Sequence, residues 1–262
     1  MAILPFEKWH GTGNDFILID STLWPESLLE PDRIATLCHR RFGIGADGLM
    51  ALRPLGDGRV EMRYFNSDGH PGSMCGNGGR CAVAFALKMK WAEYEVWLEA
   101  PDGEHRGTAL NDGRIALNMQ MAHFPNPMAH GSFVNTGSPH LVIQVSNTQE
   151  VRVEEEGRLW RHDAQFAPGG TNVNFWSVHN NAIRMRTFER GVEAETLSCG
   201  TGTVAVALVV AEEQKLPHGP LTIQAPGGTL EVDFQKGEEG YRCIVLSGPA
   251  THVFNGEVSG YD

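Results

Sequence analysis

The most constraining feature of this chain is a motif that occurs twice, in which a cysteine precedes glycines and a run of small apolar residues. The first copy, "CGNGGRCAVAFA", begins at Cys75, and the second, "CGTGTVAVALVV", begins at Cys199. The apolar run of each copy has almost no polar face, and a helix of that kind is buried on all sides. Each motif therefore predicts a buried helix that begins just after its cysteine.

Two further markers indicate that the motif belongs to a longer repeat. The offset of 124 positions between Cys75 and Cys199 also carries the "TG" at Thr12 onto the "TG" at Thr136. An offset of 125 positions carries "APDG", from Ala100, onto the later "APGG". Because three markers agree in order and almost in spacing, the sequence predicts two homologous halves.

Each half is rich in short stretches that alternate between apolar and polar residues, such as "RVEMRY", "GRIALNMQM", "NAIRMRTF" and "GTLEVDF". This alternation indicates half-buried strands, and clusters of Gly, Pro, Asn and Asp separate them. A further helix is expected from Pro31, with Ile34, Leu37 and Cys38 turned inward. The residues expected on the inner faces of the strands are Val60, Met62, Tyr64, Ile115, Leu117, Met119, Met121, Ile183, Met185, Thr187, Leu230, Val232 and Phe234.

The simplest way to bury a helix in a strand-rich half is to wrap the sheet around it. The expected fold is therefore α/β, in the mixed α+β sense, with two pseudo-symmetric domains that arise from an internal repeat. Each domain is expected to be a curved, mostly antiparallel sheet around a buried central helix, with the active site in the cleft between the domains. Residues 1–118 would form the half that carries Cys75, and residues 119–248 the half that carries Cys199.

The two repeated cysteines have the surroundings of reactive thiols. A helix N-terminus carries unpaired N–H groups and partial positive charge, which favour a thiolate and can bind a carboxylate. Two such thiols on opposite sides of one carbon can invert a stereocentre without a cofactor, because one removes a proton and the other delivers one. From the residues alone, catalysis and packing are about equally favoured for Cys75 and Cys199, since cysteine is often buried. Cys38, Cys81 and Cys243 are interpreted as buried packing residues.

Composition narrows the partners and the compartment. The net charge is −11 and the chain has no cluster of Lys and Arg, which argues against nucleic acid and anionic membranes as partners. Five cysteines, with no signal peptide and no apolar run of bilayer length, indicate a cytoplasmic protein with free thiols. The spacing of His, Cys and Glu predicts no metal site. The expected partner is a small-molecule substrate, since inversion of a stereocentre by two thiols acts on one bound carbon.

Seven segments resemble the diaminopimelate epimerases in order and spacing, and together they run from Phe6 to Gly256. They are "FEKWHGTGNDF", "GIGADG", "YFNSDGHPGSMCGNGGRC", "NTGSPH", "GGTNVNF", "ERGVEAETLSCGTGT" and "ATHVFNG". The resemblance implies a two-base epimerase, without pyridoxal phosphate or any other cofactor, that interconverts LL- and meso-2,6-diaminopimelate in lysine and peptidoglycan precursor synthesis. It also implies a homodimer with Phe254 at the contact, and a tail, residues 249–262, that returns to the first domain.

The resemblance also implies roles for individual residues. Cys75 and Cys199 would be the acid and base, supported by His140 and Glu189. The residues expected to contact substrate are Asn14, Asn66, Gly76, Asn77, Asn172, Glu189, Arg190, Gly200 and Thr201. This chain has Gly48 and Ser138 where some members of the family carry other residues, so contacts of these two with substrate stay open.

Three other functions were weighed against this one. Proline racemases and hydroxyproline epimerases also use two cysteines, but they carry a histidine where this chain has Asn77. A thiol–disulfide redox protein would use Cys75 and Cys199, although redox pairs usually lie close together in sequence. An amino-acid-binding module without catalysis would need no thiols.

Overall fold

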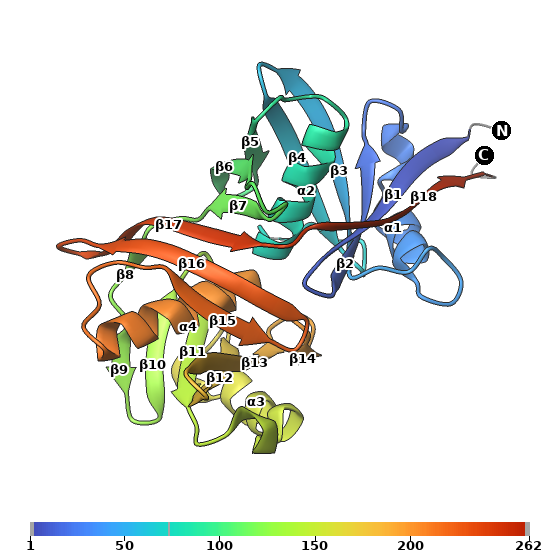
Figure 1. Ribbon diagram of the computed structural model, residues 1–262. Helices are drawn as coiled ribbons and strands as arrows, with labels where there is room; N and C mark the ends of the chain where they lie inside the picture. The colour runs from blue at the N-terminus through green and yellow to red at the C-terminus, as the bar shows by residue number, and fades with distance from the viewer. Residues whose placement is uncertain (1–2, 73, 260–262) are drawn as a thin grey trace. The chain divides into compact units, whose positions relative to one another are not determined.

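The computed structural model describes residues 3–72 and 74–259. The chain divides into two units of about equal size, shown in Figure 1: the first is Met1–Leu117 with Pro249–Asp262, and the second is Asn118–Gly248. Among the described residues, no helix is long and apolar enough to cross a membrane.

The first unit is one mixed sheet in which hydrogen-bonded neighbours follow chain order, with the C-terminal strand added beside the first strand. Its strands are β1 (Leu4–Gly11), β2 (Asn14–Asp20), β3 (Gly48–Gly56), β4 (Arg59–Asn66), β5 (Glu95–Ala100), β6 (Gly103–Ala109), β7 (Ile115–Asn118) and β18 (Thr251–Val258). The pairs β2–β3 and β4–β5 are parallel. A parallel pair needs a long crossover, and these two crossovers contain the helices α1 (Pro31–Cys38) and α2 (Gly76–Lys88). A short 3-10 helix, η1 (Glu26–Leu28), precedes α1.

The second unit repeats this arrangement. Its main strands are β10 (Gly131–Asn135), β11 (Pro139–Gln144), β12 (Asn172–His179), β13 (Ala182–Glu189), β15 (Leu221–Ala225), β16 (Gly228–Lys236) and β17 (Gly240–Gly248). The pairs β11–β12 and β13–β15 are parallel, and their crossovers contain α3 (Val153–Arg161) and α4 (Gly200–Glu213). Smaller elements are β8 (Ala122–His123), β9 (Asn126–Met128), β14 (Ala194–Thr196), η2 (Thr148–Glu150) and η3 (Ala164–Phe166).

The two units match strand by strand, which confirms the predicted internal repeat. From β1 to β7 and from β10 to β17, the types of strand pairing follow the same order. In each unit they are antiparallel, parallel, antiparallel, parallel, antiparallel and antiparallel. The register agrees as well: Phe16 pairs with Gly48 in the first unit, and His140 pairs with Asn172 in the second. Both pairs are related by the offset of 124 that separates the two cysteine motifs.

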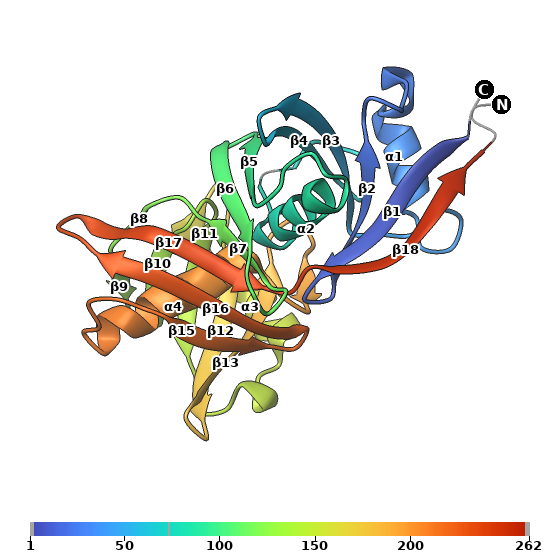
Figure 2. The same ribbon diagram turned by 45° about the horizontal axis from the view of Figure 1, so that its top comes forward.

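Each unit encloses one helix, as predicted from the apolar runs. In the second unit α4 is buried from Gly200 to Ala211 and contacts strands from β10 to β17, so the sheet curves around it. In the first unit α2 lies against β1, β2, β3, β5 and β6, and Figure 2 shows it within the curve of these strands. The core around α4 includes Phe234, Tyr241 and Leu246, which have no exposed surface.

Most of the predicted strand faces are confirmed, and so is the helix from Pro31. The inward positions of β4, β13 and β16 are buried, with only Tyr64 partly exposed. One strand is shorter than predicted: β7 ends at Asn118, and Met121 is 64% exposed. The pairing of β7 with β6 ends at Leu117, and alternation in sequence carries no mark of where a strand loses its partner.

The interpretation of Cys243 as a buried residue is wrong. The register between β16 and β17 shifts near Asp233, and across this bulge both Arg242 and Cys243 are exposed. Cys243 has φ of 51°, the left-handed conformation. A bulge adds one residue to a strand and breaks the alternation of its faces. No pattern in "YRCIVL" predicts this bulge.

Candidate active site

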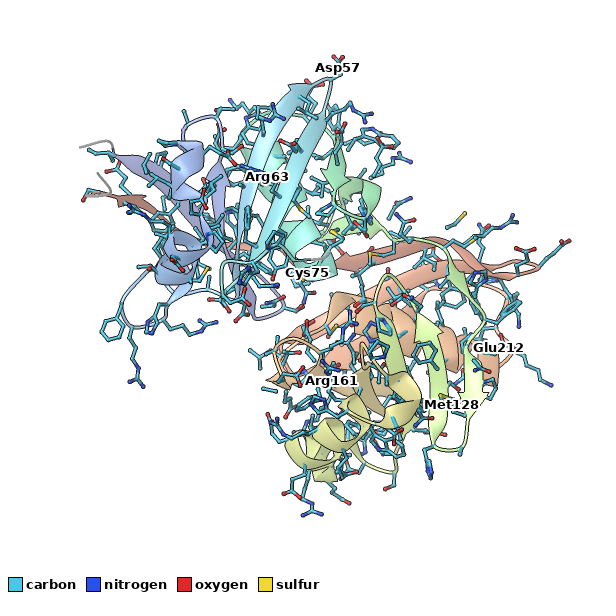
Figure 3. All side chains as sticks on the ribbon, turned by 180° about the vertical axis from the view of Figure 1, so that it is seen from behind. Asp57, Arg63, Cys75, Met128, Arg161 and Glu212 are labelled. Atoms are coloured by element: carbon cyan, nitrogen blue, oxygen red, sulfur yellow. The ribbon has the colours of Figure 1, made fainter. Side chains whose placement is uncertain are left out.

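Cys75 and Cys199 occupy the same structural position in the two units. Each is the N-cap residue of its helix, with extended backbone: φ is −110° for Cys75 and −125° for Cys199. Neither side chain caps its own helix, so neither sulfur is bound to the backbone N–H groups of the first turn. Figure 3 shows Cys75 at the start of α2. The prediction that both thiols precede buried helices is confirmed.

The second glycine of each motif lies where a strand packs closely on the helix. A Cβ atom on Gly78 would lie 2.0 Å from the Cε atom of Met50, and one on Gly202 would lie 2.4 Å from Oδ1 of Asn174. Both distances are too short for carbon, so these glycines admit side chains from β3 and β12 to the start of the helix. This packing role adds to the ligand access expected from the sequence.

Beside Cys75, an asparagine is held in one orientation. The Nδ2 atom of Asn14 donates to Oδ2 of Asp47 over 2.7 Å, which leaves Oδ1 of Asn14 as the atom 3.5 Å from the sulfur of Cys75. Asn77 donates to the same Oδ1 over 3.3 Å. Because an amide oxygen only accepts hydrogen bonds, the thiol of Cys75 is the donor in its contact with Asn14.

Asp47, which accepts from Asn14, belongs to a group of charged side chains. Arg40 bridges Asp15 and Asp47 over 2.6 and 2.7 Å, and Lys8 lies 2.7 Å from Asp15. Burial alone raises the pKa of Asp15, but the hydrogen bonds from Arg40 and Lys8 outweigh it and lower that pKa to about 2. The Asp15 carboxylate therefore remains ionised at neutral pH, and Asp47, bridged to it by Arg40, holds the amide of Asn14.

Asn77 is oriented by a buried arginine that the sequence analysis did not single out. The Arg80 side chain has no exposed surface, and it donates to Oδ1 of Asn77 over 3.0 Å and to the carbonyl of Gly76 over 3.1 Å. A third bond of 3.4 Å reaches the carbonyl of Pro249. Burial lowers the pKa of Arg80 to about 10, so the guanidinium stays charged at neutral pH. The side-chain oxygen of Asn77 thus accepts from Arg80, and its side-chain nitrogen donates to Asn14.

Beside Cys199, the sulfur contacts a hydroxyl that is itself bound to a histidine. The Oγ1 atom of Thr201 lies 3.6 Å from the sulfur and 3.0 Å from Nε2 of His140. His140 has no exposed surface, and its Nδ1 lies 3.0 Å from Nδ2 of Asn174. Burial, with a smaller effect of the Arg190 charge, lowers the pKa of His140 to about 3. The imidazole is therefore neutral at neutral pH.

A second polar cluster in the same unit joins two of the residues predicted to bind substrate, and a third, Glu189, lies directly before Arg190 in the chain. Asn172 accepts from the backbone N–H of Arg190 over 2.9 Å and donates to Oγ of Ser138 over 3.0 Å. The guanidinium of Arg190 lies 3.4 Å from the same hydroxyl. Glu189 accepts from the hydroxyl of Thr196 over 2.9 Å. Ser138, left open by the sequence, is thus part of this cluster.

The structure divides the predicted site residues between the units. The first unit holds Asn14, Asn66, Cys75, Gly76 and Asn77, and within it Asn14 and Asn77 meet Cys75 or each other, while Asn66 ends β4. The second unit holds His140, Asn172, Glu189, Arg190, Cys199, Gly200 and Thr201. In residues 3–72 and 74–259, no three His, Cys, Asp or Glu side chains are grouped to hold a metal ion.

Three supporting residues were missed by the sequence analysis: Asp47, Arg80 and Asn174. All three lie within segments that carried the family resemblance, "GIGADG", "CGNGGRC" and "GGTNVNF". The sequence therefore contained these three residues within the motifs that carried the resemblance. Only the folded structure shows which neighbour each side chain meets.

Comparison with known proteins shows the family of the chain. The sequence model of the family described as diaminopimelate epimerase matches residues 6–124 and 132–253. The diaminopimelate epimerase of Flavobacterium psychrophilum is 42% identical over 250 residues, which cover 94% of this chain and 97% of that protein. The diaminopimelate epimerase of Chlorobaculum tepidum is 39% identical over 258 residues, which cover 95% and 99%.

Solved structures share the fold over nearly the whole chain. A PhzF-family phenazine biosynthesis protein of Bacillus anthracis superposes with a TM-score of 0.76 at 15% identity, covering 99% of this chain and 100% of that one. A hydroxyproline epimerase from Agrobacterium vitis, with bound trans-4-hydroxy-L-proline, has a TM-score of 0.73 at 16% identity and covers 98% and 91%.

The repeated sheets, each around a helix headed by a cysteine, define a protein of the duplicated fold that these two structures share. The full-length matches in sequence narrow this class further. The chain belongs to the diaminopimelate epimerase family, a family of isomerases. The resemblance inferred from the seven sequence segments is thereby confirmed.

Proposed function

We propose that this protein interconverts LL- and meso-2,6-diaminopimelate by proton transfer between two cysteines, without pyridoxal phosphate, in the supply of lysine and peptidoglycan precursors. The observation that carries the proposal is the matched position of Cys75 and Cys199, each at the glycine-flanked start of a buried helix in one of two homologous units. The names of the relatives support diaminopimelate as the substrate.

In the proposed reaction, one sulfur is a thiolate and the other a thiol. The thiolate takes the proton from the α-carbon, and the thiol delivers its own proton to the opposite face of the same carbon. One C–H bond breaks and another forms, no electrons leave the system, and the two sulfurs exchange roles. The proposed reaction requires that the sulfurs of Cys75 and Cys199 both reach one α-carbon.

The helix N-termini supply the electrostatic part of the mechanism. We assign the carboxylate at the reacting centre to the backbone N–H groups that begin α2 and α4, at Gly76, Asn77, Gly200 and Thr201. These groups have no acceptor within their own helix and lie at the positive end of its dipole. They would stabilise the negative charge that develops on the carboxylate as the α-proton leaves.

The far end of the substrate is assigned to charged and amide side chains. Arg190 would bind the distal carboxylate and Glu189 an ammonium group, with Asn66 and Asn172 as neutral partners. Two contacts support this assignment: Asn172 accepts from the backbone N–H of Arg190, and the half-buried guanidinium lies 3.4 Å from the hydroxyl of Ser138, which Asn172 also bonds. His140 would act through Thr201 on Cys199, since these are its contacts.

We further propose that the protein is a cytoplasmic homodimer that acts on a small molecule and binds neither nucleic acid nor membranes. None of the five cysteines, all of which the structure describes, forms a disulfide, which suits a reducing compartment. Phe254 on β18 is 44% exposed and packs edge to face on Phe6, with ring centroids 6.1 Å apart. An exposed aromatic on a pairing strand suits the proposed contact between copies, and Phe254→Asp should give monomers in sedimentation experiments.

The proposal is tested by incubating the protein in deuterated water with LL-diaminopimelate, lysine and proline in parallel. We expect deuterium at one α-carbon of diaminopimelate together with formation of the meso isomer, and no comparable exchange in the other two amino acids. Racemisation of proline as fast as that of diaminopimelate would show a proline racemase instead. Absence of exchange in all three would leave only redox or binding functions for the two thiols.

A further inference from the structure

We infer that Asn174 is a positioning residue that fixes the tautomer of His140 and thereby turns the hydroxyl of Thr201 towards the sulfur of Cys199. The inference rests on the proposed function of Cys199 as one of the two proton-transfer groups. Asn174 lies on β12 at the start of α4 and has no exposed surface.

The orientation of the Asn174 amide is fixed by two neighbours other than His140. The hydroxyl of Thr187 donates to Oδ1 of Asn174 over 3.0 Å. The Nδ2 atom of Asn174 donates to the carbonyl of Leu141 over 3.3 Å. Because a carbonyl cannot donate, the nitrogen must face Leu141, and the atom that contacts His140 is that same nitrogen.

This orientation decides where the ring proton of His140 lies. An amide NH₂ group only donates, so Nδ1 of His140 accepts and carries no proton. The ring of a neutral histidine has one N–H, which must therefore be on Nε2. Arg190 is the charged group that acts on this ring, and it opposes a second proton there, as burial does. The Nε2 proton points to Thr201, whose Oγ1 is 3.0 Å away.

The hydroxyl of Thr201 keeps its own proton to donate, and a thiolate at Cys199 would be an acceptor for it. Its oxygen accepts from Nε2 of His140, and the sulfur of Cys199 lies 3.6 Å away, within hydrogen-bonding range for the larger sulfur atom. The chain of donors runs from Asn174 to His140, to Thr201 and to Cys199. A hydrogen bond donated to a sulfur stabilises its charged form and so favours the thiolate.

The first unit lacks this chain, although its backbone is equivalent. The offset of 124 places Phe16 where the second unit has His140, and Met50 where it has Asn174. Phe16 and Met50 are buried apolar residues that cannot pass a hydrogen bond to Cys75. The polar pair in the second unit is therefore not a general requirement of the fold, which favours a role at the thiol.

Gly202 supports the same conclusion. A Cβ atom at this position would lie 2.4 Å from Oδ1 of Asn174 and 3.3 Å from the sulfur of Cys199. The glycine thus gives Asn174 the space to lie against the helix start. A bulkier residue there would displace the amide from the position that His140 and Thr187 hold.

The tautomer is measured directly by nitrogen NMR of protein labelled in its histidine rings, since protonated and unprotonated ring nitrogens have well-separated shifts. Loss of one pair of signals in His140→Phe assigns the ring. We expect the proton on Nε2 in the wild type. In Asn174→Asp an oxygen faces the ring, so Nδ1 must gain a proton. The buried control Ser177→Ala, on the same strand, should leave the signals unchanged. A wild-type proton on Nδ1, or no change in Asn174→Asp, would overturn the inference.

The effect on the thiol is measured by alkylation of Cys199 with iodoacetamide as a function of pH, in a Cys75→Ala background. We expect Asn174→Leu and Thr201→Val to slow alkylation near pH 7 by about tenfold, which corresponds to a thiol pKa about one unit higher. The rates should converge at high pH, where the thiol is ionised in every variant. Thr201→Ser keeps the hydroxyl and should restore the wild-type profile, whereas Ser177→Ala should not alter it.

These two measurements do not depend on turnover. If the protein fails to epimerise diaminopimelate but the NMR and alkylation results hold, the proposed function is wrong and the hydrogen-bond chain is right. If it epimerises diaminopimelate while the pH profile of Cys199 is unchanged in both Asn174→Leu and Thr201→Val, the chain does not act on the thiol. Should Asn174→Leu fail to fold, Thr201→Val and Asn174→Asp decide the question.

Discussion

The Nδ2 atom of Asn14 lies 2.7 Å from Oδ2 of Asp47, and this contact determines which end of the Asn14 amide meets the sulfur of Cys75. Without Asp47 the amide is held only by the 3.3 Å hydrogen bond from Asn77, so its nitrogen can more easily turn to face the sulfur in place of its oxygen. Supporting contacts of this kind are as important to a site as the groups that touch the substrate.

Replacing Asp47 by Ala should therefore weaken catalysis without removing either thiol. Hydrogen bonds to charged groups contribute about 1.5–3 kcal/mol, and partial exposure of Asp47 reduces this. We expect kcat/KM for diaminopimelate to fall roughly tenfold. Asp112→Ala, at an exposed carboxylate paired with Arg114, is the matched control and should be unchanged. Equal activity of the two variants would contradict the role of Asp47.

Arg80 gives a prediction on stability. Its buried guanidinium donates to the side chain of Asn77 and to the carbonyl of Gly76. Only the planar fork of an arginine reaches several acceptors at once, so lysine could not replace it. Arg80→Met leaves these acceptors buried without their donor. Its free energy of unfolding should fall by about 2–4 kcal/mol, measured by chemical denaturation. Arg59→Met, at an exposed ion pair, should lower the free energy of unfolding far less.

His140 predicts how stability depends on pH. Its pKa is about 3 in the folded protein, against an ordinary value of 6.5. Between these values the unfolded chain binds a proton that the folded protein does not, so the stability of the wild type falls as the pH falls. The slope from this one group approaches about 1.4 kcal/mol per pH unit.

The variant His140→Asn lacks this contribution and isolates it. The difference in free energy of unfolding between wild type and variant should narrow as the pH falls from about 6.5 towards 4. Other groups titrate alike in both proteins and cancel. A difference that stays constant over this range would show that His140 binds its proton equally well in the folded and unfolded protein.

Arg190 tests the assignment of the substrate. A bidentate contact between arginine and carboxylate is geometrically specific, and lysine cannot reproduce it. We expect Arg190→Lys to lose about 10- to 100-fold in kcat/KM for diaminopimelate. The loss should appear only for substrates with a distal carboxylate. Wild-type activity in Arg190→Lys would place the distal carboxylate elsewhere.

The sequence predicted the large features of the fold because they repeat or run over many residues. The buried helices after Cys75 and Cys199 follow from apolar runs, and the two halves follow from markers at one offset. The bulge at Cys243 and the end of β7 depend on the pairing of distant strands. No local pattern encodes that pairing, so these features were missed.

For the site, motifs in the sequence predict candidate residues, whereas the contacts between those residues depend on packing in the fold. Motif letters identified Asn14, His140 and Thr201 as candidates, yet gave no reason to choose Asn174 or Asp47 as their partners. Asn174 lies on β12 and Asp47 directly before β3. Both meet their partners only in the folded sheet, where distant segments lie side by side, as His140 and Asn172 do across β11 and β12. Hydrogen-bond direction, on which the chemistry of the thiols depends, is visible only when those neighbours are known.

The most direct test of the central claim is epimerisation of LL-diaminopimelate by Cys75→Ala and by Cys199→Ala, each with its fold checked by circular dichroism. Each variant lacks one side of a two-sided proton transfer, and a positioned acid or base contributes about 100- to 10,000-fold. The account predicts that both variants stay folded and form the meso isomer at least about 100-fold more slowly than the wild type. Turnover near the wild-type rate in either variant would contradict the assignment of Cys75 and Cys199 as the two bases.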